Sequence, residues 1–342
     1  MHWNKFFIKQ YSLNEFFHGG VGYADMETML GRLNFKPVSF PFYNNFSLIA
    51  KIARLFYLLR LSFTLPKDSM LVFIYPVFAK MNQLLLRLAL KKNISIICIV
   101  ADIDGIKDGD SKLLAENIAE LKRYKNFVVH NESMRQWLKK QIPACTITTI
   151  EFFDFLATAY NGQRQKSGNI VFAGNLAKSV FLEKLHLVTE RFTELHFNLY
   201  GDGHTKTMIT QNGVTYKGLF KAYDLPSKLE GSFGLVWDGE SIQEPGGSLG
   251  DYMRYITHHK ISLYIISGLP LIVPDMAASA PLVEKYGIGI TVHTLFEIGN
   301  RINGITDDQY QQMRNNMQSV AQRITSGKCL SAAIAELEKE LN

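Results

Sequence analysis

A lysine preceded by two histidines stands at the expected start of a buried helix in the second half of the chain. His258, His259 and Lys260 come directly before the apolar run at 261–268, and Thr257 is placed to cap the helix. Cations in the first turn of a helix oppose its dipole unless an anion neutralises them. Backbone N–H groups and an amine placed there suit the diphosphate of a nucleotide. We therefore predict an anion site at Lys260, with exposure of the same side chains to solvent as the alternative.

A second cation follows the strand that we expect at 169–173. Gly174 and Asn175 permit a tight turn and a close approach of the backbone to a phosphate or a ribose. Lys178 then lies at or near the next helix start, where it would contact the same diphosphate. Gly-Asn pairs are common between strands and helices, so this segment alone is a weak indication of a phosphate site. It becomes informative because Lys260 lies in the same half of the chain.

The loop at 238–252 is rich in acids and glycines. Carboxylates accept hydrogen bonds from sugar hydroxyls and a tyrosine offers a ring face, so Glu244, Asp251 and Tyr252 are predicted to bind a sugar. A mobile surface loop is the alternative. Asp238, Glu244 and Asp251 also raise the question of a metal, but no histidine stands at ligand spacing beside them. We therefore expect no fixed divalent-metal site.

Two carboxylates follow the strand expected at 94–100. Asp102 and Asp104 come directly after it, where they would point into a cleft at the carboxyl edge of a parallel sheet. One of them can act as general base on an acceptor hydroxyl, with Asp102 as the first candidate and Asp104 as the second. Capping of a helix is the competing role, and we expect it for one of the two.

A glycine-rich turn at 18–23 (HGGVGY) precedes a helical pattern at 25–33. The turn departs from G-x-G-x-x-G, and no G-K-[ST] follows, so it is not a P-loop. We expect Gly20 to approach a nucleotide or its sugar from the side opposite Lys260.

Short apolar strands alternate with helical patterns along the whole chain, which predicts an α/β protein with parallel sheets. The strands are expected at 70–75, 94–100, 126–129, 146–150, 169–173, 197–201, 214–218, 233–237, 270–273 and 289–292. Because the polar segment 161–168 separates two such series, we predict two Rossmann-like domains that face a cleft, at 1–160 and 161–306. The helical segment 307–342 is expected to fold back toward the first domain.

The composition of the chain indicates which classes of partner and which cellular compartment to expect. The 342 residues carry a formal net charge of +6, which favours an anionic partner such as a nucleotide or an acidic lipid surface. The basic residues are dispersed without an aromatic-basic cluster, so no nucleic-acid partner is expected. The three cysteines are far apart and show no C-x-x-C spacing, which fits a cytoplasmic chain with reduced thiols. No run of about 18 uncharged apolar residues is present, so we expect no transmembrane helix.

The segment 46–63 has an amphipathic helical pattern. Leu48, Ile52, Leu55 and Leu59 are among the apolar residues that share one face, and the basic residues lie off it. We expect this face to pack in the core. The alternative is that the helix rests on the headgroups of an anionic membrane, which would suit an acceptor carried on a lipid.

Several segments together resemble one group of bacterial GT-B glycosyltransferases. The group includes the β-1,6-galactofuranosyltransferases of O-antigen assembly and the streptococcal adhesin glucosyltransferases of the glucosyltransferase 3 type. The resemblance covers most of the chain and is carried by FGLVWDGES, GDYMRY, HHKISLYIISGLPLIV and EKYGIG, with VFAGNL, YPVFAK, ADIDGI and VVHNESM as further support. The galactofuranosyltransferase branch is the more similar, since GDY followed by HK-x-SLY recurs there.

The resemblance implies the donor and the residues that hold it. A UDP-sugar would bind mainly to the second domain, with its diphosphate at Lys178 and Lys260. The remaining contacts that the resemblance implies come from His258, His259, Ile261 and Ser262 around the diphosphate, Tyr216 near the uracil or ribose, and Gly20 near the donor.

Members of the group often carry His-Asp where this chain has Ala101-Asp102, which leaves the identity of the catalytic base open. The resemblance implies inverting, metal-independent transfer of galactofuranose to a saccharide or lipid-linked saccharide during surface polysaccharide synthesis, without a cofactor. Such an enzyme would be cytoplasmic or peripheral at the inner face of the membrane, and a homo-oligomer is left open. The alternatives are a glucosyltransferase acting on a glycoprotein glycan, a non-catalytic subunit that binds a UDP-sugar, and a sugar-nucleotide hydrolase or epimerase.

Overall fold

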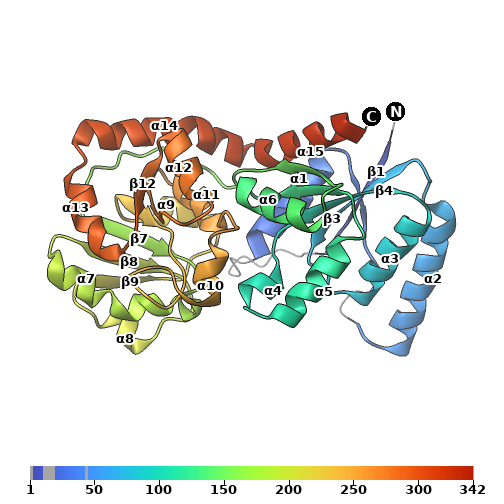
Figure 1. The fold of residues 1–342 in the computed structure, drawn as a ribbon, viewed down its shortest axis with the longest axis horizontal. Coiled ribbons are helices and arrows are strands. Elements are labelled where there is room, and N and C mark those ends of the chain that lie inside the picture. Colours follow the sequence, from blue (N-terminus) through green and yellow to red (C-terminus); the bar gives the residue numbers. More distant parts are fainter. Residues whose placement is uncertain (1–2, 11–19, 43–44, 342) are drawn as a thin grey trace.

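The computed structural model describes residues 3–10, 20–42 and 45–341. It consists of two lobes side by side, each built on a six-stranded sheet whose strands are all parallel (Figure 1). We call them the N-terminal lobe, with strands β1 to β6, and the C-terminal lobe, with strands β7 to β12. Parallel strands need crossover helices, and these cover both faces of each sheet.

The N-terminal sheet has the strand order β2-β1-β3-β4-β5-β6. Its strands are β1 (Asn4–Ile8), β2 (Lys36–Val38), β3 (Ser69–Tyr75), β4 (Ser95–Val100), β5 (Asn126–Val129) and β6 (Thr146–Thr149). The sequence pattern predicted the last four but missed β1 and β2. Strand β2 has only three residues and contains Pro37, which an edge strand tolerates because its N–H side needs no partner.

Alternate residues of the central strand β3 supply two separate cores. Leu71 and Phe73 face one core together with residues from α2 (Leu48–Thr64), α3 (Lys80–Lys91) and α6 (Glu132–Gln141). Met70 and Val72 face the other, with residues from α1 (Val21–Arg32) and α15 (Lys328–Leu341). This burial on both sides is why β3 reads as a continuous apolar run rather than an alternating one. The lobe also contains the short helix α4 (Asp104–Lys107) and α5 (Ser111–Leu121).

The C-terminal sheet has the order β12-β11-β10-β7-β8-β9. Its strands are β7 (Asn169–Ala173), β8 (His196–Tyr200), β9 (Val214–Gly218), β10 (Phe233–Leu235), β11 (Leu271–Pro274) and β12 (Gly289–Val292), and all six were predicted to within two residues. The helical elements around it are η2 (Leu176–Lys178), η3 (Val180–Lys184), α7 (His186–Arg191), α8 (Lys206–Ile209), α9 (Leu225–Lys228), α10 (Gly247–Tyr252), α11 (His259–Ile266), α12 (Ala280–Tyr286), η4 (Leu295–Glu297), α13 (Ile298–Asn303) and α14 (Asp307–Thr325).

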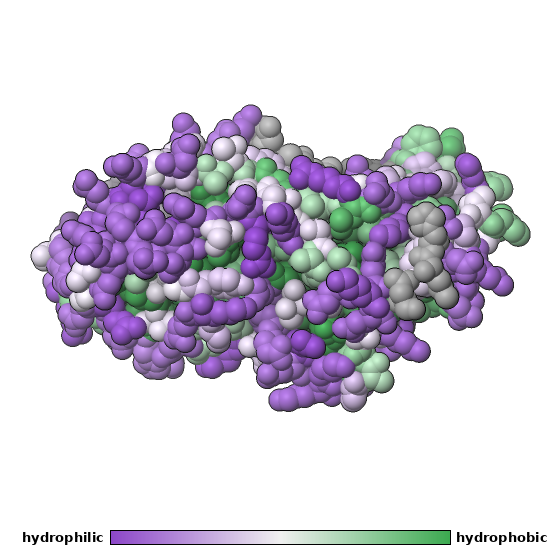
Figure 2. All heavy atoms as spheres, turned by 90° about the horizontal axis from the view of Figure 1, so that it is seen from above, coloured by the Kyte–Doolittle hydropathy of each residue, from purple (hydrophilic) through white to green (hydrophobic). Residues whose placement is uncertain are grey.

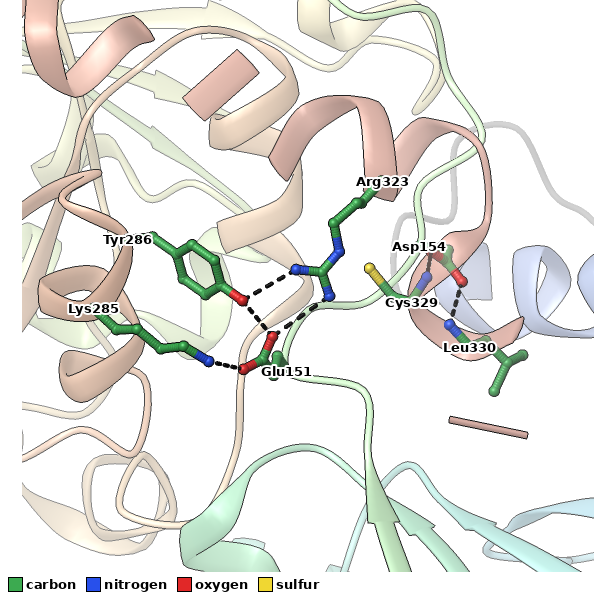
Figure 3. A network of polar contacts seen from close by, with 7 residues as sticks. All are labelled: Glu151, Asp154, Lys285, Tyr286, Arg323, Cys329 and Leu330. Atoms are coloured by element: carbon green, nitrogen blue, oxygen red, sulfur yellow. Dashed lines mark hydrogen bonds and ion pairs between the residues drawn. The ribbon is translucent and has the colours of Figure 1, made fainter. Parts of the chain in front are cut away.

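The last two helices run along one side of the molecule, with α14 over the C-terminal lobe and α15 over the N-terminal lobe (Figure 1). Helix α14 packs on α11, and α15 packs on β5, β6 and α1. Asp154, in the segment between the lobes, accepts hydrogen bonds from the N–H groups of Cys329 and Leu330 at 3.0 and 2.9 Å and so satisfies the start of α15 (Figure 3).

A second polar cluster joins the same crossing segment to the C-terminal lobe. Both carboxylate oxygens of Glu151 are bonded, one to the amine of Lys285 at 2.5 Å and one to the hydroxyl of Tyr286 at 2.6 Å (Figure 3). Arg323 of α14 lies 3.5 Å from the same carboxylate. These contacts fix the chain where it passes between the lobes. Among the described residues no helix combines the length and the apolar composition that a membrane span requires.

Candidate active site

Two neighbouring pockets lie between the lobes, at the carboxyl ends of the sheet strands. The larger, of about 510 Å³, is lined by residues that follow β7 and β8 and by the start of α11. The smaller, of about 170 Å³, is lined by residues of α1, by Asp102 after β4 and by His130 after β5. His258 and His259 line both pockets, so they form the wall that the two share. This is the edge at which open parallel sheets bind ligands.

The larger pocket brings together six of the residues that the sequence analysis assigned to a diphosphate. They are Gly174, Asn175, Lys178, His258, His259 and Lys260. The first three come from the turn after β7, and the others come from the start of α11. Residues 80 positions apart in the chain therefore line one cavity, with two amines and the N-terminus of a helix facing it.

Helix α11 begins one residue later than the sequence pattern indicated. The N-cap is His258 rather than Thr257, and its side chain makes no capping hydrogen bond. Thr257 is buried, where its hydroxyl accepts a bond from Asn131 at 3.0 Å and its N–H donates to Nδ1 of His130 at 3.2 Å. The prediction of Thr257 as the cap is wrong because this residue bonds to the N-terminal lobe instead.

The amine of Lys260 lies inside the larger pocket and is paired with an acid. It donates to Asp238 Oδ1 at 2.9 Å and lies 4.5 Å from the ring centre of Phe172, with 14% of its side chain exposed. The other oxygen of Asp238 lies 2.8 Å from His258 Nε2. Burial alone would raise the pKa of Asp238, but the charges of Lys260 and His258 outweigh it and lower that pKa far below its usual range. Asp238 is therefore a carboxylate held between two basic groups.

Asp102 stands in the smaller pocket, held by residues of both lobes. The hydroxyl of Tyr23 donates to Asp102 Oδ2 at 3.1 Å, and the hydroxyl of Tyr252 lies 3.3 Å from Oδ1. Lys107 lies 3.4 Å from the same carboxylate. The neighbouring acid, Asp104, is the first residue of α4, pairs with Lys107 at 2.7 Å and is not among the residues that line either pocket. Of the two predicted carboxylates, Asp102 alone faces a cavity.

His130 is a pocket residue that the sequence analysis did not single out. It follows β5, next to β4 in the sheet, and its ring lines the smaller pocket beside Asp102. Burial lowers the pKa of His130 to about 3, so the ring is neutral at physiological pH and accepts the Thr257 N–H at Nδ1. The sequence feature that could have identified His130 as a pocket residue is its position directly after a buried strand.

Four other predicted residues do not present their side chains to the pockets. Tyr252 is 2% exposed and packs in the core of the N-terminal lobe, so its ring is closed to a sugar, contrary to the prediction. Its hydroxyl instead accepts the N–H of Ile103 at 2.8 Å. Ile261 and Ser262 are fully buried, and the hydroxyl of Ser262 donates to the carbonyl of Phe153 at 2.6 Å. The hydroxyl of Tyr216 donates to the carbonyl of Gly201, a residue of the pocket wall, at 2.9 Å.

The remaining predicted residues are Glu244, Asp251 and Gly20, and none of them lines a pocket. Glu244 and Asp251 are exposed and line neither pocket. Gly20 precedes α1 directly before Val21, which lines the larger pocket, whereas 18–19 of the glycine-rich turn lie outside the described residues. Within the part of the chain that the structure describes, no three His, Cys, Asp or Glu residues are grouped so as to hold a metal ion.

Two family models match the chain and together span most of it. The model described as "Glucosyltransferase 3-like, N-terminal domain" matches residues 9–142, and that described as "Glucosyltransferase 3-like, C-terminal domain" matches residues 170–337. Among curated proteins, the chain is similar to the beta-1,6-galactofuranosyltransferase WbbI of Escherichia coli, at 27% identity over 253 residues that make up 72% of each chain. It is also similar to glucosyltransferase 3 of Streptococcus gordonii, at 30% identity over 101 residues, or 29% of each chain.

Solved structures share the fold at low sequence identity. HepE of Anabaena, solved with UDP and glucose, has a TM-score of 0.62 at 13% identity and matches 99% of this chain and all of its own. TarM of S. aureus, solved with UDP, has a TM-score of 0.57 at 16% identity and matches 84% of this chain, which spans 58% of the TarM chain. These structures have the GT-B architecture, and the predicted fold of two Rossmann-like lobes is confirmed.

Proposed function

Because the chain belongs to the glucosyltransferase 3-like family of glycosyltransferases, we propose that it transfers a sugar from a UDP-linked donor to a saccharide acceptor. The observation that carries the proposal is the larger pocket, where Lys178, Lys260 and the start of α11 converge beside the turn at Gly174. Such a pocket fits a diphosphate, and the donor would lie mainly on the C-terminal lobe.

The positive groups of this pocket would act on the leaving group. As the bond between the sugar and UDP breaks, negative charge develops on the diphosphate. The amines of Lys260 and Lys178 and the N–H groups of α11 would stabilise that charge. The Lys260 amine must first share its position beside Asp238 with the incoming phosphate, since a carboxylate oxygen lies 2.9 Å from it.

The smaller pocket would receive the acceptor. In our proposal Asp102 removes the proton from the attacking hydroxyl, and the transfer inverts the anomeric centre without a metal. Asp102 is the favoured base because it lines the cavity that adjoins the diphosphate pocket across His258 and His259. Asp104 is a weaker candidate, since it is paired with Lys107 away from both cavities.

Galactofuranose is the proposed donor sugar, and the support is the similarity to WbbI over 72% of both chains. The acceptor would then be a saccharide or lipid-linked saccharide of a bacterial surface polysaccharide such as an O-antigen, assembled at the cytoplasmic side of the membrane. Glucose is the second candidate. It is favoured by the name of the family and by the match to glucosyltransferase 3, and the proposed acceptor of this chain would then be a glycoprotein glycan.

A panel of UDP-sugars tests the proposal. The purified chain should melt at a higher temperature with UDP and with its donor sugar nucleotide, and it should transfer the sugar to an oligosaccharide acceptor. Lys260→Ala should abolish the shift for every UDP ligand, whereas Lys206→Ala, an exposed lysine of the same lobe, should leave it intact. Binding without any transfer would favour a non-catalytic subunit, and turnover without an acceptor would favour a hydrolase or epimerase.

A further inference from the structure

Helix α2 exposes a broad apolar surface at the outer end of the N-terminal lobe. Its inner face, with Ala50, Arg54 and Leu61, is buried against the lobe. Its outer face carries seven large apolar side chains with exposed fractions between 46% and 82%, namely Leu48, Ile49, Ile52, Leu55, Phe56, Leu59 and Phe63. We call these seven residues the α2 surface. The expectation that this apolar face packs in the core is therefore wrong.

The α2 surface forms one continuous stripe along the helix. At about 100° per residue, its seven side chains fall within an arc of about 120° that is centred opposite the buried face. Figure 2 shows hydrophobic residues reaching the surface at the right-hand end of the molecule, which is the end that α2 occupies in Figure 1. A stripe of this kind on a soluble protein marks a contact with an apolar partner.

The charges beside the stripe identify the partner. Lys51 borders one edge of the arc and Arg60 the other, and the sequence from 45 to 67 contains no acidic residue. An apolar stripe between basic residues matches a bilayer interface, where acyl chains meet anionic headgroups. A second copy of the chain matches less well, since pairing two α2 surfaces would bring basic residues together without an acid on either helix.

We propose that the α2 surface docks the protein in the headgroup region of a bilayer that contains anionic phospholipid. The helix would lie in the plane of the membrane, because it has 17 residues, three of them basic, and no described helix has the length and composition of a membrane span. Lys51 and Arg60 contact phosphates at the two sides, while the seven apolar side chains enter the acyl boundary. Helix α2 lies at the end of the N-terminal lobe that is far from the C-terminal lobe (Figure 1). Residues of both lobes line the pockets, so docking leaves the pockets open.

Sedimentation of the full chain with vesicles tests the proposal. The protein should bind vesicles of phosphatidylcholine and phosphatidylglycerol in a 7:3 ratio and bind pure phosphatidylcholine much more weakly. Leu55→Glu with Leu59→Glu should weaken binding by about a hundredfold, since two apolar side chains that would be buried in the bilayer are lost. The matched control is Val180→Glu with Leu187→Glu, which adds the same charge at exposed apolar positions of the C-terminal lobe and should change binding little. Lys51→Gln with Arg60→Gln should weaken binding to the anionic vesicles by about thirtyfold, at about 1 kcal/mol for each basic residue.

A second measurement separates the membrane from other occupants. In Phe56→Trp, the added tryptophan should shift its emission to shorter wavelength when the anionic vesicles are added, relative to the wild-type background. Failure of the wild type to bind these vesicles would overturn the proposal. So would a wild-type dimer in light scattering that Leu55→Glu with Leu59→Glu converts to a monomer, because the α2 surface would then be an interface between copies. The assay does not depend on sugar transfer, so an inactive protein that still binds vesicles would refute the transferase proposal alone.

Discussion

The amine of Lys260 lies 2.9 Å from Oδ1 of Asp238, while Oδ2 of the same carboxylate lies 2.8 Å from His258 Nε2. One carboxylate thus pairs with two of the three basic side chains at the start of α11. Cations at a helix N-terminus are unfavourable because they oppose the helix dipole. Here the carboxylate of Asp238 offsets that repulsion, since it lies beside both cations. It also places a negative charge beside the proposed diphosphate site.

Asp238→Asn should strengthen the binding of UDP by about tenfold, because a carboxylate beside a diphosphate repels it and competes for the Lys260 amine. The same change should lower the melting temperature of the free protein, since Lys260 and His258 lose their anionic partner. Titration calorimetry and thermal melts measure the two effects. Asp251→Asn, at an exposed position of α10 that lines neither pocket, serves as the control. Weaker UDP binding in Asp238→Asn would mean that the carboxylate orients Lys260 rather than competing for it.

Asp102→Asn should leave UDP binding intact and reduce the rate of transfer by about a hundredfold or more, as expected for loss of a general base. The amide oxygen of the asparagine can still accept from one of the tyrosine hydroxyls at 23 and 252, and its NH2 group can donate to the other, so the fold should be retained. Asp104→Asn provides the contrast, because Asp104 pairs with Lys107 outside the pockets and its loss should change the rate little. Both variants are compared by single-turnover transfer at saturating donor. Full activity in Asp102→Asn would assign the proton transfer elsewhere.

The sequence predicted the central strands because residues buried on both faces of a parallel sheet form unbroken apolar runs. It also predicted that Asp102, Gly174 and Lys260 approach one cleft, since each lies near the carboxyl end of a strand or the start of a helix at that edge. Partners across the lobes were not predictable in this way. The bonds of Tyr252 to Asp102 and of Thr257 to His130 depend on how two separately folded lobes meet.

Helix α2 shows a second limit of the sequence pattern. An apolar stripe at helical spacing is equally compatible with a protein core and with a bilayer, since both remove the same side chains from water. Only the position of α2 at the outer end of the sheet decides which face is free. Strand β2 was missed because a three-residue edge strand carries little of the apolar signal. Strand β1 lies inside the sheet and was missed because only its last two residues are buried.

His130→Asn should remove an acid-sensitive contribution to stability. The pKa of His130 falls from 6.5 to about 3 in the folded protein, so the unfolded chain binds the extra proton between these values. Lowering the pH from 7 to 5 should therefore cost the wild type about 2 kcal/mol more than the variant. The asparagine oxygen can still accept the Thr257 N–H, which keeps the contact between the lobes.

Urea unfolding of both proteins at pH 7 and pH 5 measures the His130 contribution. Burial raises the pKa of Asp154 to about 6, so the folded state binds a proton there before the unfolded chain does as the pH falls. Asp154 therefore makes the free energy of unfolding larger at lower pH, which is the opposite of the effect of His130. Taking the difference between the two proteins at each pH cancels the contribution of Asp154. Equal losses of stability in wild type and variant would contradict a neutral, buried His130.

Gly22→Ala should impair transfer, because the glycine lets α1 approach the wall between the two pockets. A Cβ at position 22 would lie 2.9 Å from Cδ2 of His259, and the rings of Phe153 and Phe155 limit how that histidine can move. The histidine ring would shift toward the pockets, and we expect kcat/KM to fall by about tenfold or more. Gly31→Ala is the matched control in the same helix, since its Cβ meets nothing within 4 Å and should stabilise α1 by about 0.5–1 kcal/mol. Steady-state kinetics and thermal melts of the two variants distinguish an effect on the active site from an effect on the stability of α1. Equal activities of the two variants would show that the position of His259 does not matter for transfer.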